Sequence, residues 1–151
     1  MILSRTSQYA IQALIHLAMQ PPGQPVLARS VASHLSVPPA YLAKTLQILT
    51  RGGLVRSFRG RSGGFCLKEG AGDTTILAIM SMIEGPGLTE SCMLGLKACE
   101  DSNPCPMHRR WKPLKERLLH LLQDQTLDVL AMAVRGGKYR IVDLPLRLLS
   151  T

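Results

Sequence analysis

The chain has 151 residues, of which 46% are hydrophobic, and a formal net charge of +8. This length suffices for one sizeable core, or for a small domain with an extension. No apolar run reaches membrane-spanning length, and the run at residues 10–19 lacks the cleavage site of a signal peptide. We therefore expect a cytoplasmic protein whose four cysteines stay reduced and bind metal or do redox chemistry.

Positive charge is concentrated in the N-terminal half. Residues 1–70 hold eight Lys or Arg and the single acid Glu69, whereas residues 71–105 hold Lys97 and five acids. A cationic block with few acids favours nucleic acid through phosphate contacts. The alternative is a solvated surface that only keeps the protein dissolved. The choice depends on whether the basic residues lie on elements shaped to enter a DNA groove.

Three short helices are predicted at the start of the chain. Ser4 can cap a first helix through about Met19. The apolar spacing in residues 27–35 predicts a second helix, and Pro39 can open a third that runs to about Arg51. A tight turn at residues 36–38 joins the second and third helices. This order of helix, tight turn and helix is typical of the helix-turn-helix motif.

The third helix is predicted to expose a face suited to a DNA groove. Its candidate DNA-contacting residues are Ala40, Ala43, Lys44, Gln47 and Arg51. The two alanines leave room for close approach, and Lys44 and Gln47 can reach base edges. Arg51 is better placed for a phosphate.

The segment that follows predicts a β-hairpin. Residues 54–58 and 65–67 read as strands around the loop RGRSGG, with Arg59 and Arg61 at the tip. Two arginines on a glycine-rich tip suit a narrow minor groove, although ordinary solvation is the alternative. The hairpin would be the wing of a winged helix-turn-helix. We interpret Cys66, within it, as a small core residue and not as a ligand.

Residues 92–108 gather side chains that bind soft metals. Cys92, Cys99, Cys105 and His108 lie within seventeen residues. Thiolates and an imidazole select zinc or iron-sulfur iron over hard cations. The six residues between the first two cysteines are many for a zinc knuckle, and the Cys105–Pro106 step favours an iron-sulfur cluster. Zinc and redox-active or inert thiols remain alternatives.

Two further helices flank this segment. A packing helix is expected at about residues 75–84, ended by Gly85, Pro86 and Gly87, which would lead into the cysteine loop. Beyond Pro106 a longer helix is expected to about Gln123. Its apolar stripe comprises Trp111, Leu114, Leu118, Leu121 and Leu122. Such a stripe predicts a homodimer, and the alternative is that the helix folds back on its own core. A last short helix at 127–134 can be capped by Thr126.

Several stretches together resemble a known family. The chain is similar to the IscR and NsrR type of bacterial iron-sulfur winged-helix regulator, the Rrf-two (Rrf2) family, over about residues 1–134. The similarity lies in the stretches RTSQYAIQALIHLA, AYLAKTLQILTRGGLVRSFRGRSGGF and CPMHRRW, and in three cysteines. The resemblance implies a homodimeric regulator, expected to be a repressor. Its iron-sulfur cluster would control binding to double-stranded promoter DNA in response to iron or cluster supply, redox state or nitric oxide.

The resemblance also implies a ligand set. Cys92, Cys99 and Cys105 would be cluster ligands, and His108 would be the fourth ligand of a [2Fe-2S] cluster, as in the IscR branch. Members with a [4Fe-4S] cluster take the fourth ligand elsewhere, sometimes from an acidic side chain in the first helix of the partner subunit. That position is here Gln8, a poor ligand. The chain departs from the IscR pattern in a gap one residue longer between Cys92 and Cys99, and in Ala43, where IscR relatives carry glutamate.

The expected fold is mainly α with a small β-hairpin, a winged helix-turn-helix domain followed by a long dimerisation helix. The segments are the DNA-binding domain at 1–70, a packing helix and connector at 71–91, the ligand loop at 92–108, the dimerisation helix and a short C-terminal helix at 106–134, and a tail of unassigned role at 135–151. An electron-transfer protein would leave the recognition helix and wing unexplained. We expect no enzyme, because no Ser/His/Asp order, Walker loop or paired-carboxylate motif is present.

Overall fold

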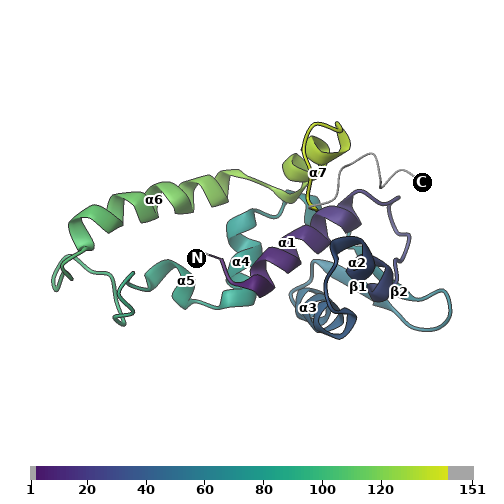
Figure 1. Cartoon of the computed structure of the whole chain (residues 1–151), viewed down its shortest axis with the longest axis horizontal. Helices are drawn as coiled ribbons and strands as arrows, with labels where there is room; N and C mark the ends of the chain where they lie inside the picture. Colours follow the sequence, from purple (N-terminus) through teal and green to yellow (C-terminus); the bar gives the residue numbers. More distant parts are fainter. Residues whose placement is uncertain (1–2, 143–151) are drawn as a thin grey trace.

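Helix α1 (Arg5–Ala18) lies at the centre of the fold, in contact with α2, α3, α4, α7 and β2 (Figure 1). The computed structural model describes residues 3–142, so residues 143–151 of the predicted tail lie outside the described residues. The other elements are α2 (Ala28–Leu35), α3 (Pro39–Arg51), β1 (Val55–Phe58), β2 (Gly64–Leu67), the 3-10 turn η1 (Ala71–Asp73), α4 (Ile76–Glu84), α5 (Gly87–Glu90), α6 (His108–Asp124) and α7 (Leu127–Arg135).

The start of α1 is fixed by its cap and by a carboxylate. Ser4 Oγ accepts a hydrogen bond from the Ser7 backbone N–H at 3.1 Å, as predicted for an N-cap. The hydroxyls of Ser4 and Ser7 both donate to Glu84, the last residue of α4. The negative charge of Glu84 is thereby stabilised at the positive end of the α1 dipole. This contact joins the end of α4 to the start of α1.

The predicted helix-turn-helix is present. Ser36 ends α2 in the left-handed conformation (φ 55°), and the Val37 N–H donates to the Ala32 carbonyl at 2.9 Å. Pro39 opens α3, where its missing N–H costs no hydrogen bond. The predicted inner face of α3 is buried, and it comprises Leu42, Thr45, Leu46 and Leu49.

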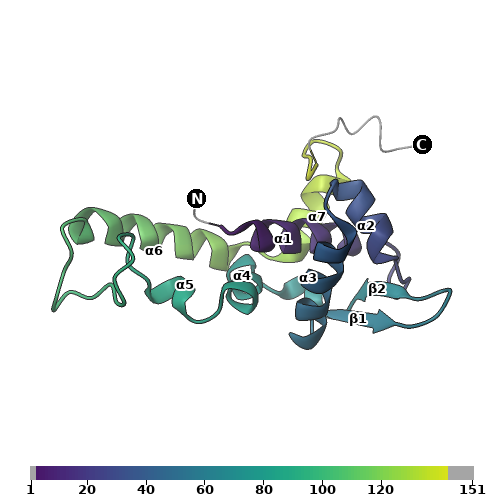
Figure 2. The same ribbon diagram turned by 60° about the horizontal axis from the view of Figure 1, so that its bottom comes forward.

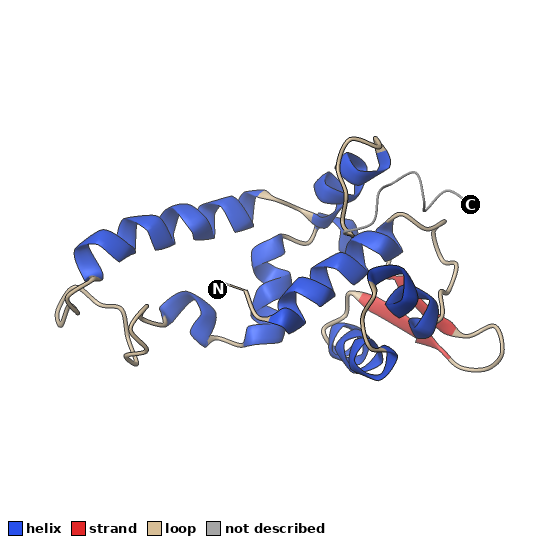
Figure 3. Cartoon of the chain, in the orientation of Figure 1, coloured by secondary structure: helices blue, strands red, loops and turns tan. Residues whose placement is uncertain are grey.

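The hairpin is antiparallel and is the only sheet among the described residues (Figure 3). Val55 pairs with Leu67, and Phe58 with Gly64. The loop before α2 extends it, since Val26 and Phe65 exchange two backbone hydrogen bonds of 2.8 Å. Gly64 has φ 140°, and a Cβ there would lie 2.4 Å from the Val26 carbonyl oxygen. Only glycine allows this close approach.

Beyond the hairpin, the structure contains two short elements that the sequence did not predict, η1 and α5. Helix α5 (Gly87–Glu90) lies in the stretch expected to be a connector between the packing helix and the cysteine loop. Pro86 supports this turn by supplying a helical φ of −66°, and the Ser91 N–H closes it on the Gly87 carbonyl. Leu88 then packs against the core.

The molecule is elongated, and α6 extends along one side of it (Figures 1 and 2). The loop between α5 and α6 lies at one end of the long axis, and the tip of the β-hairpin lies at the other. The predicted mainly α fold with a small winged hairpin and a long following helix is confirmed. Within residues 3–142 no helix is both long and apolar enough to cross a membrane.

Candidate metal centre and nucleic-acid interface

The loop at residues 91–107 begins with a tight turn at residues 92–96 that folds around Cys92. The Gly95 N–H donates to the Cys92 carbonyl at 3.0 Å, and Gly95 adopts φ 79° to make the turn. Within this turn the Leu94 N–H donates to Cys92 Sγ at 3.4 Å. This hydrogen bond lowers the pKa of the Cys92 thiol, with smaller contributions from Cys105 and from the charge of Lys115, while burial opposes the shift. The loop thus favours the thiolate, the form that binds metals.

The four predicted metal-binding side chains come together in two pairs. Cys92 Sγ lies 3.5 Å from Cys105 Sγ, and Cys99 Sγ lies 3.5 Å from His108 Nδ1. Two ligand atoms on one tetrahedral metal with bonds of about 2.3 Å stand about 3.7 Å apart. Each pair therefore has a spacing that suits two ligands of the same metal ion. Among residues 3–142, no three His, Cys, Asp or Glu side chains are grouped as ligands of one ion.

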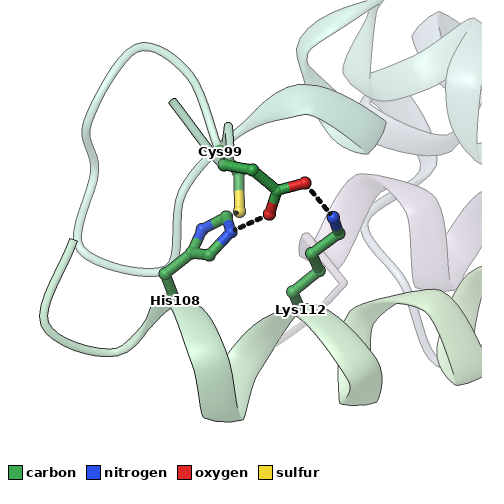
Figure 4. A network of polar contacts seen from close by, with 4 residues as sticks. Cys99, His108 and Lys112 are labelled. Atoms are coloured by element: carbon green, nitrogen blue, oxygen red, sulfur yellow. Dashed lines mark hydrogen bonds and ion pairs between the residues drawn. The ribbon is translucent and has the colours of Figure 1, made fainter. Parts of the chain in front are cut away.

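His108 is the first residue of α6 and is buried, with 5% of its surface exposed. Its Nε2 lies 2.8 Å from Asp101 Oδ1 in the loop, and Lys112 Nζ lies 2.6 Å from Asp101 Oδ2 (Figure 4). The hydrogen bond from Lys112 lowers the pKa of Asp101, and that from His108 adds to the effect. Sequence reasoning missed both Asp101 and Lys112. The four-residue spacing of His108 and Lys112 on one helix was the available signal.

The other cysteine is not part of this centre. Cys66 lies on β2 and is 4% exposed, as expected for a small core residue. It also lines a cavity of about 580 Å³ next to Arg56 and Lys68. The ligand loop lies at the far end of the molecule from the hairpin that carries Cys66 (Figure 2).

The predicted DNA-contacting residues of α3 lie on its outer face. Ala40, Lys44, Gln47 and Arg51 are exposed, whereas Ala43 is half-buried. Because Leu42, Leu46 and Leu49 are fully buried on the opposite side, α3 is held firmly against the core. The helix could therefore enter a groove without losing its packing.

The hairpin adds a second cationic surface beside α3. Arg59 and Arg61 are exposed at its tip, on the loop between β1 and β2. Sequence reasoning missed Arg56, whose guanidinium lies 5.3 Å from the ring centroid of Phe58. The alternation of strand residues was the available signal, since residues two apart share a face. The structure thus places three exposed arginines on and beside the wing.

The predicted apolar stripe of α6 is divided between two environments. Trp111, Leu118 and Leu122 are half-buried and line a cavity of about 480 Å³ together with Met80 of α4 and Leu88 of α5. Leu114 and Leu121 remain 58% and 57% exposed. Part of the stripe therefore packs on the chain's own helices, and its outer edge is left without cover in a single chain.

Known proteins similar to this chain are transcription regulators. A chain of Aquifex aeolicus assigned as an HTH-type transcriptional regulator is 31% identical over 84% of this chain and 89% of its own length. The HTH-type transcriptional regulator IscR of Pectobacterium atrosepticum is 27% identical, over 86% of this chain and 79% of its own.

Solved structures share the fold. CymR of B. subtilis, described as the global cysteine regulator, has a TM-score of 0.71 and 27% identity, over 87% of this chain and 96% of its own. IscR of T. potens has a TM-score of 0.69 at 24% identity, over 91% and 92% of the two chains. Residues 3–133 match the Rrf2 family, described as "Iron-dependent Transcriptional regulator". The chain belongs to this family, and it is a DNA-binding transcription regulator and not an enzyme.

Proposed function

We propose that the chain is a homodimeric repressor whose promoter binding is controlled by an iron-sulfur cluster, in its simplest form [2Fe-2S]. Cys92, Cys99, Cys105 and His108 would hold the cluster. The observation that carries this proposal is the arrangement of these four donors in two pairs, each 3.5 Å apart, at the start of α6.

The pairing favours two metal ions over one. In a [2Fe-2S] cluster each iron takes two protein ligands, so the four donors must form two pairs, one for each iron. Cys92 and Cys105 would serve one iron, and Cys99 and His108 the other. A single zinc ion would need all four donors at about the same mutual spacing. The donor types, three thiols and an imidazole, fit the same group.

The surroundings favour an anionic centre. Three thiolates and bridging sulfides carry net negative charge, and the centre would lie at the N-terminal end of α6, where the helix dipole gives partial positive charge. The lowered pKa of Cys92 acts in the same direction, as does the nearby charge of Lys115.

When bound, an iron-sulfur cluster supplies a centre that responds to oxidants, nitric oxide or iron shortage. The ligands would join the loop to the first turn of α6 through His108. The other end of α6 is fixed, because the Ile76 N–H donates to the Gln125 carbonyl at 2.8 Å. Release of the ligands would free only the first end of the helix. In a dimer built on α6, this would change the spacing of the two recognition helices.

DNA would be read by α3 and positioned by the wing. Lys44 and Gln47 would reach base edges in the major groove, with Ala40 and Ala43 allowing close approach and Arg51 on a phosphate. Arg59 and Arg61 would enter the minor groove. Two such units in a dimer fit half-sites about one DNA turn, roughly 34 Å, apart. A change in their spacing would therefore change operator affinity.

The test is a DNA titration at fixed salt with three forms of the protein. These are anaerobically purified protein with its iron and sulfide measured, chelator-treated apo-protein, and the Cys92→Ala/Cys99→Ala/Cys105→Ala variant. We expect about two iron and two sulfide per subunit. We expect the iron-loaded form to bind DNA about 5 to 150-fold more tightly than the apo-protein and the variant. The dimer mass should be the same in all three forms. Binding of every tested promoter within twofold by all three forms would reject cluster control.

Two alternatives are separated by the same measurements. A structural zinc site would give one zinc per subunit, no visible absorption and no dependence of DNA binding on iron. The likeness to the B. subtilis cysteine regulator makes a response to another effector the second candidate. In that case apo-protein and iron-loaded protein would bind equally, and an added metabolite would change the affinity of both.

A further inference from the structure

We infer that Asp101 is a positioning residue for the proposed metal centre, because its carboxylate holds the His108 imidazole with Nδ1 turned toward the Cys99 sulfur. This inference rests on the proposed function, in which His108 is a ligand. It assigns a task to a loop residue that is not itself a ligand. It also assigns the ligand atom, Nδ1, and not the ring nitrogen that lies nearer the carboxylate.

The two ring nitrogens of His108 have different partners. Nε2 lies 2.8 Å from Asp101 Oδ1, and Nδ1 lies 3.5 Å from Cys99 Sγ (Figure 4). The ring is buried, with only 6% of the side chain exposed, so water cannot replace the carboxylate as the partner of Nε2 without rearrangement. The carboxylate and the sulfur thus fix the ring from two sides.

The chemistry of the carboxylate determines which nitrogen carries the hydrogen. An ionised carboxylate only accepts hydrogen bonds, so Nε2 must be the donor. A neutral imidazole that carries its hydrogen on Nε2 keeps a free lone pair on Nδ1, and only such a nitrogen can bind a metal. A carboxylate behind a metal-binding histidine orients the ring and raises the basicity of the ligand. The Asp101–His108 contact has this arrangement.

Lys112 supports the carboxylate from the same helix that carries His108. Its Nζ lies 2.6 Å from Asp101 Oδ2, and its position one turn after His108 places both side chains on one face of α6. The Asp101 side chain is 72% exposed, so a single contact would hold it weakly. With a partner on each oxygen, the carboxylate joins the loop to the first two turns of α6.

The first measurement uses the metal-free protein, so that it does not depend on cluster assembly. The tautomer of His108 is determined by ¹⁵N NMR at pH 8 in wild type, Asp101→Ala, Asp101→Asn and the neighbouring control Glu100→Ala. We expect the Nε2–H form in wild type and Glu100→Ala, and a mixture of tautomers in Asp101→Ala. Asp101→Asn should keep the Nε2–H form, because the amide oxygen can still accept the hydrogen bond.

The second measurement uses iron-loaded protein. The rate of cluster loss to a chelator should rise about tenfold in Asp101→Ala, within the range for residues behind a metal ligand. It should rise less in Lys112→Met and stay within twofold of wild type in Glu100→Ala. Equal tautomers and equal loss rates in wild type and Asp101→Ala would overturn this inference alone. A wild-type protein that takes up no iron would overturn the proposed function and this inference together.

Discussion

Thr75 and Thr126 pair across an isolated antiparallel bridge that joins the start of α4 to the junction between α6 and α7. The Ile76 N–H donates to the Gln125 carbonyl at 2.8 Å, and the Leu127 N–H donates to the Thr74 carbonyl at 3.0 Å. Both threonines are also N-caps, since their hydroxyls accept from Ala78 N–H and Val129 N–H. One small element therefore starts two helices and fixes the end of a third.

Thr126→Ala tests this junction. Loss of an N-cap hydroxyl typically costs about 1 kcal/mol, and we expect a decrease of that size in the free energy of unfolding. The measurement is urea unfolding followed by circular dichroism. Thr89→Ala is the matched control, because Thr89 is exposed on the short helix α5 and caps nothing among the described residues. Equal unfolding free energies for wild type and Thr126→Ala would contradict the capping role.

His16 is predicted to make the fold sensitive to acid. Burial in α1 lowers the pKa of His16 to about 4, and the charge of His34, whose ring centroid lies 4.4 Å away, adds to the shift. The folded pKa is below the unfolded value of about 6.5, so the folded state disfavours the protonated ring. The stabilisation is full above about pH 6.5 and is lost as the pH falls toward about 4.

His16→Gln should therefore unfold with a weaker pH dependence between about pH 6.5 and 4. Because the ring is only half-buried, solvent screening reduces the expected difference to about 1 to 2 kcal/mol. The measurement is urea unfolding at several pH values, and His120→Gln, at an exposed position on α6, is the control. Parallel pH profiles for wild type and His16→Gln would contradict this assignment.

The local elements of the fold could be predicted where the helical spacing of apolar residues agrees with the residues that start and end helices. Pro39 at the first position of α3 and Leu42, Leu46 and Leu49 at helical spacing are one example. The helix α5 could not be predicted, because four residues are too few to show a period. Its first residue is a glycine, which sequence reasoning interprets as a helix end.

The candidate metal centre could be predicted in its donors but not in their arrangement. Spacing brings Cys92, Cys99, Cys105 and His108 into one loop, but it does not determine which two are neighbours. Asp101 could not be predicted, because its contact with His108 depends on how the loop closes on α6. Which apolar residues of α6 are covered and which are exposed depends likewise on where α4 and α5 lie. The spacing of residues along α6 alone does not contain this information.

Arg59→Ala tests the wing. If the side chain enters a groove, operator binding should weaken by about 1 to 3 kcal/mol. Arg117→Ala is the control, because Arg117 is exposed on α6, away from the hairpin. The measurement is a DNA titration at several salt concentrations, in which the loss of one positive charge from the DNA interface would also reduce the salt slope by about one. Equal affinities for wild type and Arg59→Ala would reject the wing assignment.

Leu114 and Leu121 test the proposed dimer. Both are more than half exposed in the single chain, so Leu114→Lys/Leu121→Lys should leave the fold of one subunit intact. If a second copy covers them, burial of the surface that each leucine still exposes contributes about 1 to 2 kcal/mol, which the charged side chains would remove. We expect monomers at micromolar concentration by analytical ultracentrifugation. Glu116→Lys, an exposed change on the same helix, should stay dimeric.

His108→Ala and Cys105→Ala should differ in how much of the cluster they lose. A neutral imidazole is more readily replaced by a water or an external thiol than a thiolate is, so His108→Ala should retain more iron than Cys105→Ala. Cys105 is also half of a thiol pair at 3.5 Å, and its loss would leave Cys92 as the only protein ligand of that iron.

The readouts are iron and sulfide content, visible absorption and the fluorescence of Trp111. Trp111 is the one tryptophan of the chain and lies one turn after His108 on α6. Cys66→Ala, on the distant hairpin, should match wild type in all of them. Intact and equal clusters in His108→Ala and Cys105→Ala would rule out both residues as ligands.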